Sequence, residues 1–169
     1  MELKEVMLKR RSVRKFTSEV VSDEQINTLL HYAMSGPSAC NKQPWEFYVV
    51  TNPDKLKELR EFAKYNNIES PLNIIVCGNL DRCLPGKVAE FWVQDCSAAI
   101  ENILLGVTDL GLGAVWCGVY PDMDVVNKVK DILEIKENFI PLGIVRIGYP
   151  DCNTNPGDWY KEEYVHYIK

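Results

Sequence analysis

Residues 88–112 read VAEFWVQDCSAAIENILLGVTDLGL and form a long, predominantly apolar stretch in the middle of the chain. Apolar side chains fall on most of the circumference of a helix drawn through these residues, and a helix of that kind is buried in a protein core. Gly111 and Gly113 predict where the helix ends. The sequence therefore predicts a central buried helix around which the rest of the chain folds.

Helices and strands are both predicted in the flanking sequence. The clearest helix signal is a capping box, in which Gln25 follows Ser22 ahead of apolar residues at helical spacing. Apolar spacing predicts further helices from residue 2 to the basic cluster at 9–15, from 51–53 through the inward-facing Leu56, Leu59 and Ala63, and at 125–133. Runs of β-branched and aromatic residues predict strands at 47–50, 72–77, 114–119 and 140–147. Mixed elements without an internal repeat or a linker predict one α+β unit.

The size and composition of the chain predict one soluble domain. The chain has 169 residues, of which 46% are hydrophobic, and this is enough to bury one sizeable core. Uninterrupted apolar runs are much shorter than the roughly 20 residues needed to cross a bilayer. Residues 1–11 are charged and amphipathic, unlike a signal peptide. We expect a single domain, residues 1–169, located in the cytoplasm and without a membrane partner.

Charge is distributed unevenly along the sequence. The formal net charge is −5, which argues against a nucleic-acid partner. Residues 9–15 nevertheless carry five cations and no acid. Like charges at this density repel one another unless an anion holds them. We therefore expect an anion to bind locally at this segment.

The sequence indicates neither a metal centre nor a catalytic side chain. There are two histidines and six cysteines, and no two cysteines have C-x-x-C spacing; the cysteines are Cys40, Cys77, Cys83, Cys96, Cys117 and Cys152. This pattern favours buried free thiols over a disulfide framework or a metal ligand set. No residue is positioned by its sequence context as a nucleophile or a general base.

The basic segment at 10–16, RRSVRKF, has the chemistry of a phosphate site. Planar guanidinium groups around the hydroxyl of Ser12 would supply bidentate, charge-assisted hydrogen bonds and one neutral donor to a phosphate monoester. A solvated basic face or a salt-bridged helix end is an equally good interpretation of this segment taken alone.

A second segment, PSACNKQPW at 37–45, has the chemistry of a flavin-binding loop. Its small residues permit close approach, and the carboxamides of Asn41 and Gln43 donate and accept hydrogen bonds together. Such groups suit the pyrimidine edge of a flavin. Taken alone, the same segment is better interpreted as a capped helix end followed by an ordinary proline turn.

Three blocks together resemble the FMN-dependent nitroreductase family: RRSVRKF at 10–16, PSACNKQPW at 37–45 and LGLGAVWCGV at 110–119. The resemblance extends to FWVQDCSAA at 91–99, VRIGYP at 145–150 and the terminal EYVHY, and so covers essentially the whole chain. It implies a short family member with a three-layer α/β/α sandwich and a mostly antiparallel central sheet. It also implies an obligate homodimer with FMN at the subunit interface, in which each C-terminal strand joins the partner's sheet. The alternating residues 164–168 suit such strand addition.

The resemblance implies roles for individual residues. Arg10 and Ser12 would hold the phosphate and ribityl end of FMN, with Arg11 assisting. Arg14 would lie near flavin N1 and O2, where a fixed cation stabilises the anionic reduced ring. Relatives carry Arg or Lys in the tail as a further phosphate cation, whereas this chain has Trp159 there, and Lys161 is the nearest substitute.

The ring itself would be held by two other segments. From the other subunit, the resemblance implies Pro37, Ser38, Ala39 and Asn41 along the ring. Relatives also make polar contacts to the flavin from a further helical region, and the candidates for these contacts here are Asn66 and Asn67. The segment Trp116, Cys117 and Gly118, taken as a loop, would bring backbone N–H groups to N5 and O4, with Gly118 making the approach sterically possible.

The implied activity is transfer of electrons from NADH or NADPH, through FMN, to an acceptor such as a nitroaromatic, a quinone or another conjugated electrophile. Two substrates that use one pocket in turn would give ping-pong kinetics. Two alternatives stay open: other flavin chemistry on the same fold, such as reductive dehalogenation or flavin destruction, and a flavin-binding protein without turnover.

Overall fold

The computed structural model describes residues 1–62 and 67–169. The expectations for Ala63 and Asn66 lie outside the described residues. The helices are α1 (Leu3–Lys9), α2 (Asp23–Met34), α3 (Pro53–Glu61), α4 (Phe91–Asp109) and α5 (Met123–Leu133), and the strands are β1 (Trp45–Val50), β2 (Leu72–Asn79), β3 (Gly113–Gly118) and β4 (Phe139–Gly148). Short 3₁₀ turns occur at Ala39–Asn41, Leu80–Arg82, Gly86–Val88 and Glu162–Tyr164. All predicted elements in the body of the chain are present, with ends displaced by a few residues.

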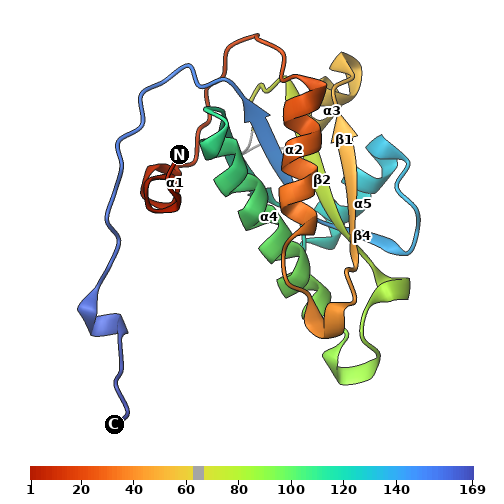
Figure 1. The fold of residues 1–169 in the computed structure, drawn as a ribbon. Helices are drawn as coiled ribbons and strands as arrows, with labels where there is room; N and C mark the ends of the chain where they lie inside the picture. Colours follow the sequence, from red (N-terminus) through yellow and green to blue (C-terminus); the bar gives the residue numbers. More distant parts are fainter. Residues whose placement is uncertain (63–66) are drawn as a thin grey trace.

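The four strands form one antiparallel sheet in the order β1-β2-β4-β3, covered by helices on both faces. On one face, α2 and α4 pack against residues such as Leu72, Ile74 and Ile147. On the other face, α3 and α5 pack against residues such as Ile75 and Ile144. Figure 1 shows α2 and α4 in front of the sheet and α3 and α5 behind it. The expected α+β fold with a three-layer α/β/α sandwich and an antiparallel sheet is confirmed.

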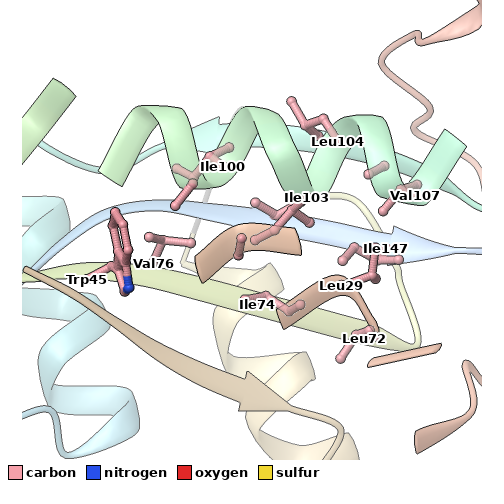
Figure 2. Close-up of a cluster of buried hydrophobic side chains, with 14 of the residues drawn as sticks. Leu29, Trp45, Leu72, Ile74, Val76, Ile100, Ile103, Leu104, Val107 and Ile147 are labelled. Carbon is pink, nitrogen blue, oxygen red and sulfur yellow. The ribbon is translucent and has the colours of Figure 1, made fainter. Parts of the chain in front are cut away.

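Helix α4 is the central helix that residues 88–112 predicted. Figure 2 shows its residues Ile100 and Ile103 directed at the sheet, with Leu29 of α2 close by. The helix begins at Phe91 rather than at Val88, because Gly86–Val88 turns separately as a 3₁₀ helix. It ends as predicted before Gly111, whose φ of +72° is the left-handed conformation that favours glycine just beyond a helix. Gly113 was expected to belong to this helix end, but it is the first residue of β3.

No helix in the described part of the chain is both long enough and apolar enough to cross a membrane.

A charged side chain lies at the centre of the sheet. Arg146 of β4 is 1% exposed, and its Nη1 and Nη2 donate to the carbonyl oxygens of Ile68 and Leu59 at 3.0 Å each. The carbonyl of Leu59 belongs to the last turn of α3, which leaves its carbonyls without partners inside the helix. Arg146 therefore fastens the end of α3 and residue 68 to the sheet.

The segment after α1 meets the outer edge of β3 near its start, at Ala114. Ser12 forms a parallel bridge with Ala114, and the N–H of Val13 donates to the carbonyl oxygen of Ala114 at 2.8 Å. Further along, Phe16 pairs with Pro150 just after β4. The C-terminal tail, residues 151–169, then leaves the body of the protein, past α1, as the dark blue trace of Figure 1.

Candidate cofactor-binding site

Four predicted site residues line one hollow. Arg10, Arg11, Ser12 and Arg14 share a pocket of about 440 Å³ with three residues of the tail, Thr154, Asn155 and Trp159. The arrangement follows from the local fold, because α1 ends at Lys9 and the next residues extend beside β3. The structure thus brings the cations and the hydroxyl of the basic segment together. Lys161 lies on the exposed tail with its ammonium near the ring of Tyr164, and the tail aromatic that lines the hollow is Trp159.

The positive charge of this hollow is only weakly compensated. The Nε of Arg10 lies 3.5 Å from Oε1 of Glu101, and both side chains are partly exposed, so the pair contributes little stability. Within residues 1–62 and 67–169, Arg11 and Arg14 form no ion pair with a carboxylate. A hollow with this charge is suited to bind an anion.

Two nitrogens of the Arg11 guanidinium donate to backbone carbonyl oxygens. Its Nε donates to the carbonyl oxygen of Asn155 at 2.9 Å, and its Nη1 donates to the carbonyl oxygen of Arg10 at 2.6 Å. Its Nη2 is buried and has no hydrogen-bond acceptor among the described residues. Buried donors without an acceptor are costly, and Nδ2 of Asn73 and Nε of Arg146 in the core share this feature.

The loop at 37–43 forms a separate, conformationally strained structure beyond α2. Cys40, Asn41 and Gln43 have φ values of +49°, +52° and +47°. Left-handed backbone is unfavourable for residues other than glycine and costs about 1–3 kcal/mol for each. Strain of this kind persists at functional sites when surrounding contacts determine the loop. Here Ser38 provides one such contact, because its Oγ accepts from the N–H of Gln43 at 2.9 Å.

Asp95 holds this loop against the central helix. Its Oδ1 accepts from the N–H of Ala39 at 2.8 Å, and the residue is 7% exposed. Sequence reasoning missed Asp95, because it was included in the apolar stretch that predicted α4. The only signal available was its charge within that stretch.

Replacing Asp95 by alanine is expected to lower the free energy of unfolding by about 1–3 kcal/mol, because the N–H of Ala39 then lacks its acceptor. Asp95→Asn keeps an oxygen at the same place and is expected to remain close to the parent protein. Urea unfolding of the three proteins measures the difference, and equal losses in both variants would contradict this role for Asp95.

Trp116, Cys117 and Gly118 belong to strand β3 and not to a loop. The N–H of Val119 donates to Leu142 of β4, whereas the carbonyl of Ala114 accepts from Val13 on the opposite side of β3. Backbone groups of successive strand residues point to alternate sides. The N–H groups of Trp116 and Gly118 therefore point to the outer edge of the sheet, and that of Cys117 points toward β4.

These three residues also differ in what surrounds them on the faces of the sheet. Cys117 is 6% exposed and packs on the face covered by α5, in agreement with the expectation of a buried free thiol. Trp116 is 37% exposed and lies over Gly143 of β4. A Cβ on Gly118 would meet no described atom of the chain within 4 Å. The glycine at 118 is therefore not required by packing within the described chain, and the space beside it is open on the face of β3 that also carries Trp116.

The six cysteines are free thiols, and the expectation that they are buried holds for part of the set. Cys77, Cys96 and Cys117 are buried, Cys83 is half-buried, and Cys40 and Cys152 are exposed. Burial raises the pKa of the Cys77 and Cys96 thiols far above the ordinary value. Cys40 departs from the expectation because it lies on the strained loop, and Cys152 because it lies on the tail.

Comparisons with known proteins agree with the fold of the chain. A family model described as "Nitroreductase family" matches residues 7–72 and 84–149. The chain is 41% identical to a protein of Methanothermobacter thermautotrophicus named "Putative NADH dehydrogenase/NAD(P)H nitroreductase", over 100% of this chain and 88% of that protein. The crystal structure of a protein of the same name from Parabacteroides distasonis superimposes with a TM-score of 0.93 at 33% identity, covering 100% of this chain and 99% of the other. An FMN-dependent nitroreductase from Clostridium difficile superimposes with a TM-score of 0.88 at 25% identity, over 98% of this chain and 99% of the other.

Proposed function

The chain belongs to the nitroreductase family, and from this membership we propose that it is an oxidoreductase that binds FMN and passes electrons from NADH or NADPH to an organic acceptor. The observation that carries the proposal is the cationic hollow at residues 10–14, which gathers three arginines and a serine where the phosphate of FMN would bind. The names of relatives add support, since they describe NAD(P)H nitroreductase and FMN-dependent activities.

The residues present fit FMN at both ends of the cofactor. In the hollow, Arg14 has no carboxylate partner in the described chain, and Nη2 of Arg11 is a buried donor without an acceptor there. At the ring end, the N–H groups of Trp116 and Gly118 point to the outer edge of β3 and have no hydrogen-bond acceptor in the described part of the chain. We assign the phosphate and ribityl contacts to Arg10 and Ser12, with Arg11 assisting. We assign the ring contacts to Arg14 at the pyrimidine end, to β3 and to residues 37–41 of a second subunit.

FMN supplies the redox chemistry when bound, and the protein supplies binding, orientation and electrostatics. Arg14 would place a fixed positive charge near the pyrimidine end of the ring, where it favours the negative charge of the reduced state. The N–H groups of Trp116 and Gly118 would orient the ring by donating hydrogen bonds at the sheet edge. The donor nucleotide and the acceptor would use the same face in turn, which gives ping-pong kinetics.

We also propose that the protein is a homodimer. The tail exposes Tyr160, Tyr164, Tyr167 and Ile168, with exposed fractions of 68%, 72%, 75% and 100%. The outer face of α1 exposes Leu3 and Met7 as well. Large apolar side chains gathered on exposed surfaces mark sites of protein association. A second copy of the chain that receives the tail would cover them, in agreement with the strand addition expected for residues 164–168.

The proposed function is tested by the absorbance spectrum of purified protein that has been mixed with FMN and desalted. A flavin band is expected to stay with the protein, and anaerobic NADH or NADPH is expected to bleach it within seconds. Retained flavin that neither nucleotide reduces would instead indicate a flavin-binding protein without turnover. Rapid reduction followed by transfer to nitroaromatics or quinones would separate the proposal from dehalogenation or flavin destruction.

The substitution Arg14→Ala is expected to weaken FMN binding by roughly ten- to a hundredfold, because a charge-assisted hydrogen bond contributes about 1.5–3 kcal/mol. Lys15→Ala is the matched control, since it removes an equal charge from an exposed neighbour that does not line the hollow. Fluorescence titration with FMN measures both dissociation constants. Equal effects of the two substitutions would remove Arg14 from the site.

A further inference from the structure

The tail contacts the body of the protein at Arg11. The Nε of Arg11 donates to the carbonyl oxygen of Asn155, and its guanidinium carbon lies 5.8 Å from the centre of the Trp159 ring. A guanidinium group at this distance from an indole is attracted to it electrostatically. Gly157 lies between these two contacts in the sequence, and it is the only residue of 151–169, all of which the structure describes, that is not exposed.

Gly157 allows Arg11 to lie against the backbone of the tail. A Cβ at this position would be 2.3 Å from Nη2 of Arg11 and 3.3 Å from Cε2 of Trp159. The φ of Gly157 is not in the left-handed region, so the backbone conformation itself does not require glycine. A side chain at 157 would therefore displace the Arg11 guanidinium from its place against the tail.

The same tail segment forms one wall of the cationic hollow. Thr154, Asn155 and Trp159 line it together with Arg10, Ser12 and Arg14. Asn155 and Trp159, which belong to this wall, are also the tail residues that Arg11 contacts.

We propose that Arg11 is a positioning residue that clamps residues 154–159 in place, with Gly157 and Trp159 as the other two parts of the clamp. Nε fixes the tail through the Asn155 carbonyl, the guanidinium face holds Trp159, and Nη1 ties the group to its own backbone at Arg10. The remaining nitrogen, Nη2, faces Gly157 without an acceptor in the described chain. The clamp would hold this wall of the hollow in position before an anion binds. Loss of the clamp would therefore weaken the binding of the anion. This last step rests on the proposed function, whereas the clamp itself does not.

The clamp is tested by hydrogen–deuterium exchange of the amides of residues 154–160 in the full chain without FMN. Arg11→Ala and Gly157→Ala are each expected to speed this exchange by roughly tenfold, because the first removes a charge-assisted hydrogen bond and the second forces the parts of the clamp apart. Arg11→Lys keeps the charge but lacks the planar fork, and it is expected to exchange as fast as Arg11→Ala. Arg14→Ala is the matched control, since it removes a cation from the same hollow and is expected to leave the exchange unchanged.

FMN titration of the same proteins completes the experiment. Arg11→Ala, Gly157→Ala and Arg14→Ala are all expected to bind FMN more weakly, although Gly157→Ala removes no charge. Weaker FMN binding by Arg11→Ala with unchanged exchange in the tail would overturn the proposal and make Arg11 a ligand only. Faster exchange in both clamp variants, in a parent protein that binds no FMN, would leave the clamp standing and refute the proposed function.

Discussion

Gly118→Ala is expected to stabilise the protein without its cofactor and to weaken FMN binding. Glycine within a strand costs about 0.5–1 kcal/mol relative to alanine, and a Cβ at 118 would meet no atom within 4 Å among the residues that the structure describes. The free energy of unfolding should therefore rise by about that amount. Bound FMN would occupy the same space, and the resulting steric conflict of about 1–3 kcal/mol should weaken its binding by roughly tenfold or more.

Gly143 provides the matched control, because it is the direct partner of Gly118 in the sheet. A Cβ at 143 would stand 2.2 Å from Nε1 of Trp116. Gly143→Ala should therefore lower the free energy of unfolding by about 1–3 kcal/mol through overpacking. Urea unfolding of the proteins without FMN and fluorescence titration with FMN measure both effects. Destabilisation by Gly118→Ala, or unchanged FMN binding, would show that the open space at 118 has no connection with the cofactor.

Removing residues 160–169 is expected to convert the proposed dimer to a monomer. The deletion removes Tyr160, Tyr164, Tyr167 and Ile168, all of them exposed in the isolated chain. Burying each against a partner would contribute about 1.5 kcal/mol or more, so four of them together contribute about 6 kcal/mol. That amount corresponds to roughly a ten-thousandfold change in the dimer dissociation constant.

Sedimentation equilibrium at several protein concentrations measures this dissociation constant. The deletion begins after Trp159 and so keeps the residues that line the cationic hollow. Since the removed residues are exposed, the body of the truncated chain should keep its circular dichroism spectrum. A truncated protein that remains dimeric at micromolar concentration would show that the tail does not hold the subunits together.

The layers of the fold were predictable because local signals agree with one another. The capping box at Ser22 and Gln25 is present as predicted, and the long apolar stretch forms the helix between the sheet and solvent. Gly111 follows the end of that helix with a left-handed backbone conformation, which favours glycine at this position. Such features depend on neighbours only a few residues away, which a sequence displays directly.

The parts that escaped prediction depend on contacts between distant residues. Arg146 lies in a strand of apolar residues, and nothing in that strand indicates that the carbonyls of Leu59 and Ile68 will meet its guanidinium. Asp95 meets Ala39 across a separation of 56 residues. Arg11 was grouped with the phosphate-binding cations by its neighbours in sequence, whereas its contacts to Asn155 and Trp159 join opposite ends of the chain.

The four tryptophans divide evenly between the core and the proposed site. Trp45 and Trp92 are 6% and 4% exposed, whereas Trp116 and Trp159 are 37% and 77% exposed. The two buried indoles are expected to emit at shorter wavelength and to shift to the red when the core opens. The two exposed indoles are expected to emit at longer wavelength, and because they belong to the segments proposed to contact FMN, bound flavin is expected to quench them most strongly. Intrinsic fluorescence is thus expected to report unfolding through the two buried tryptophans and occupancy of the site through the two exposed ones.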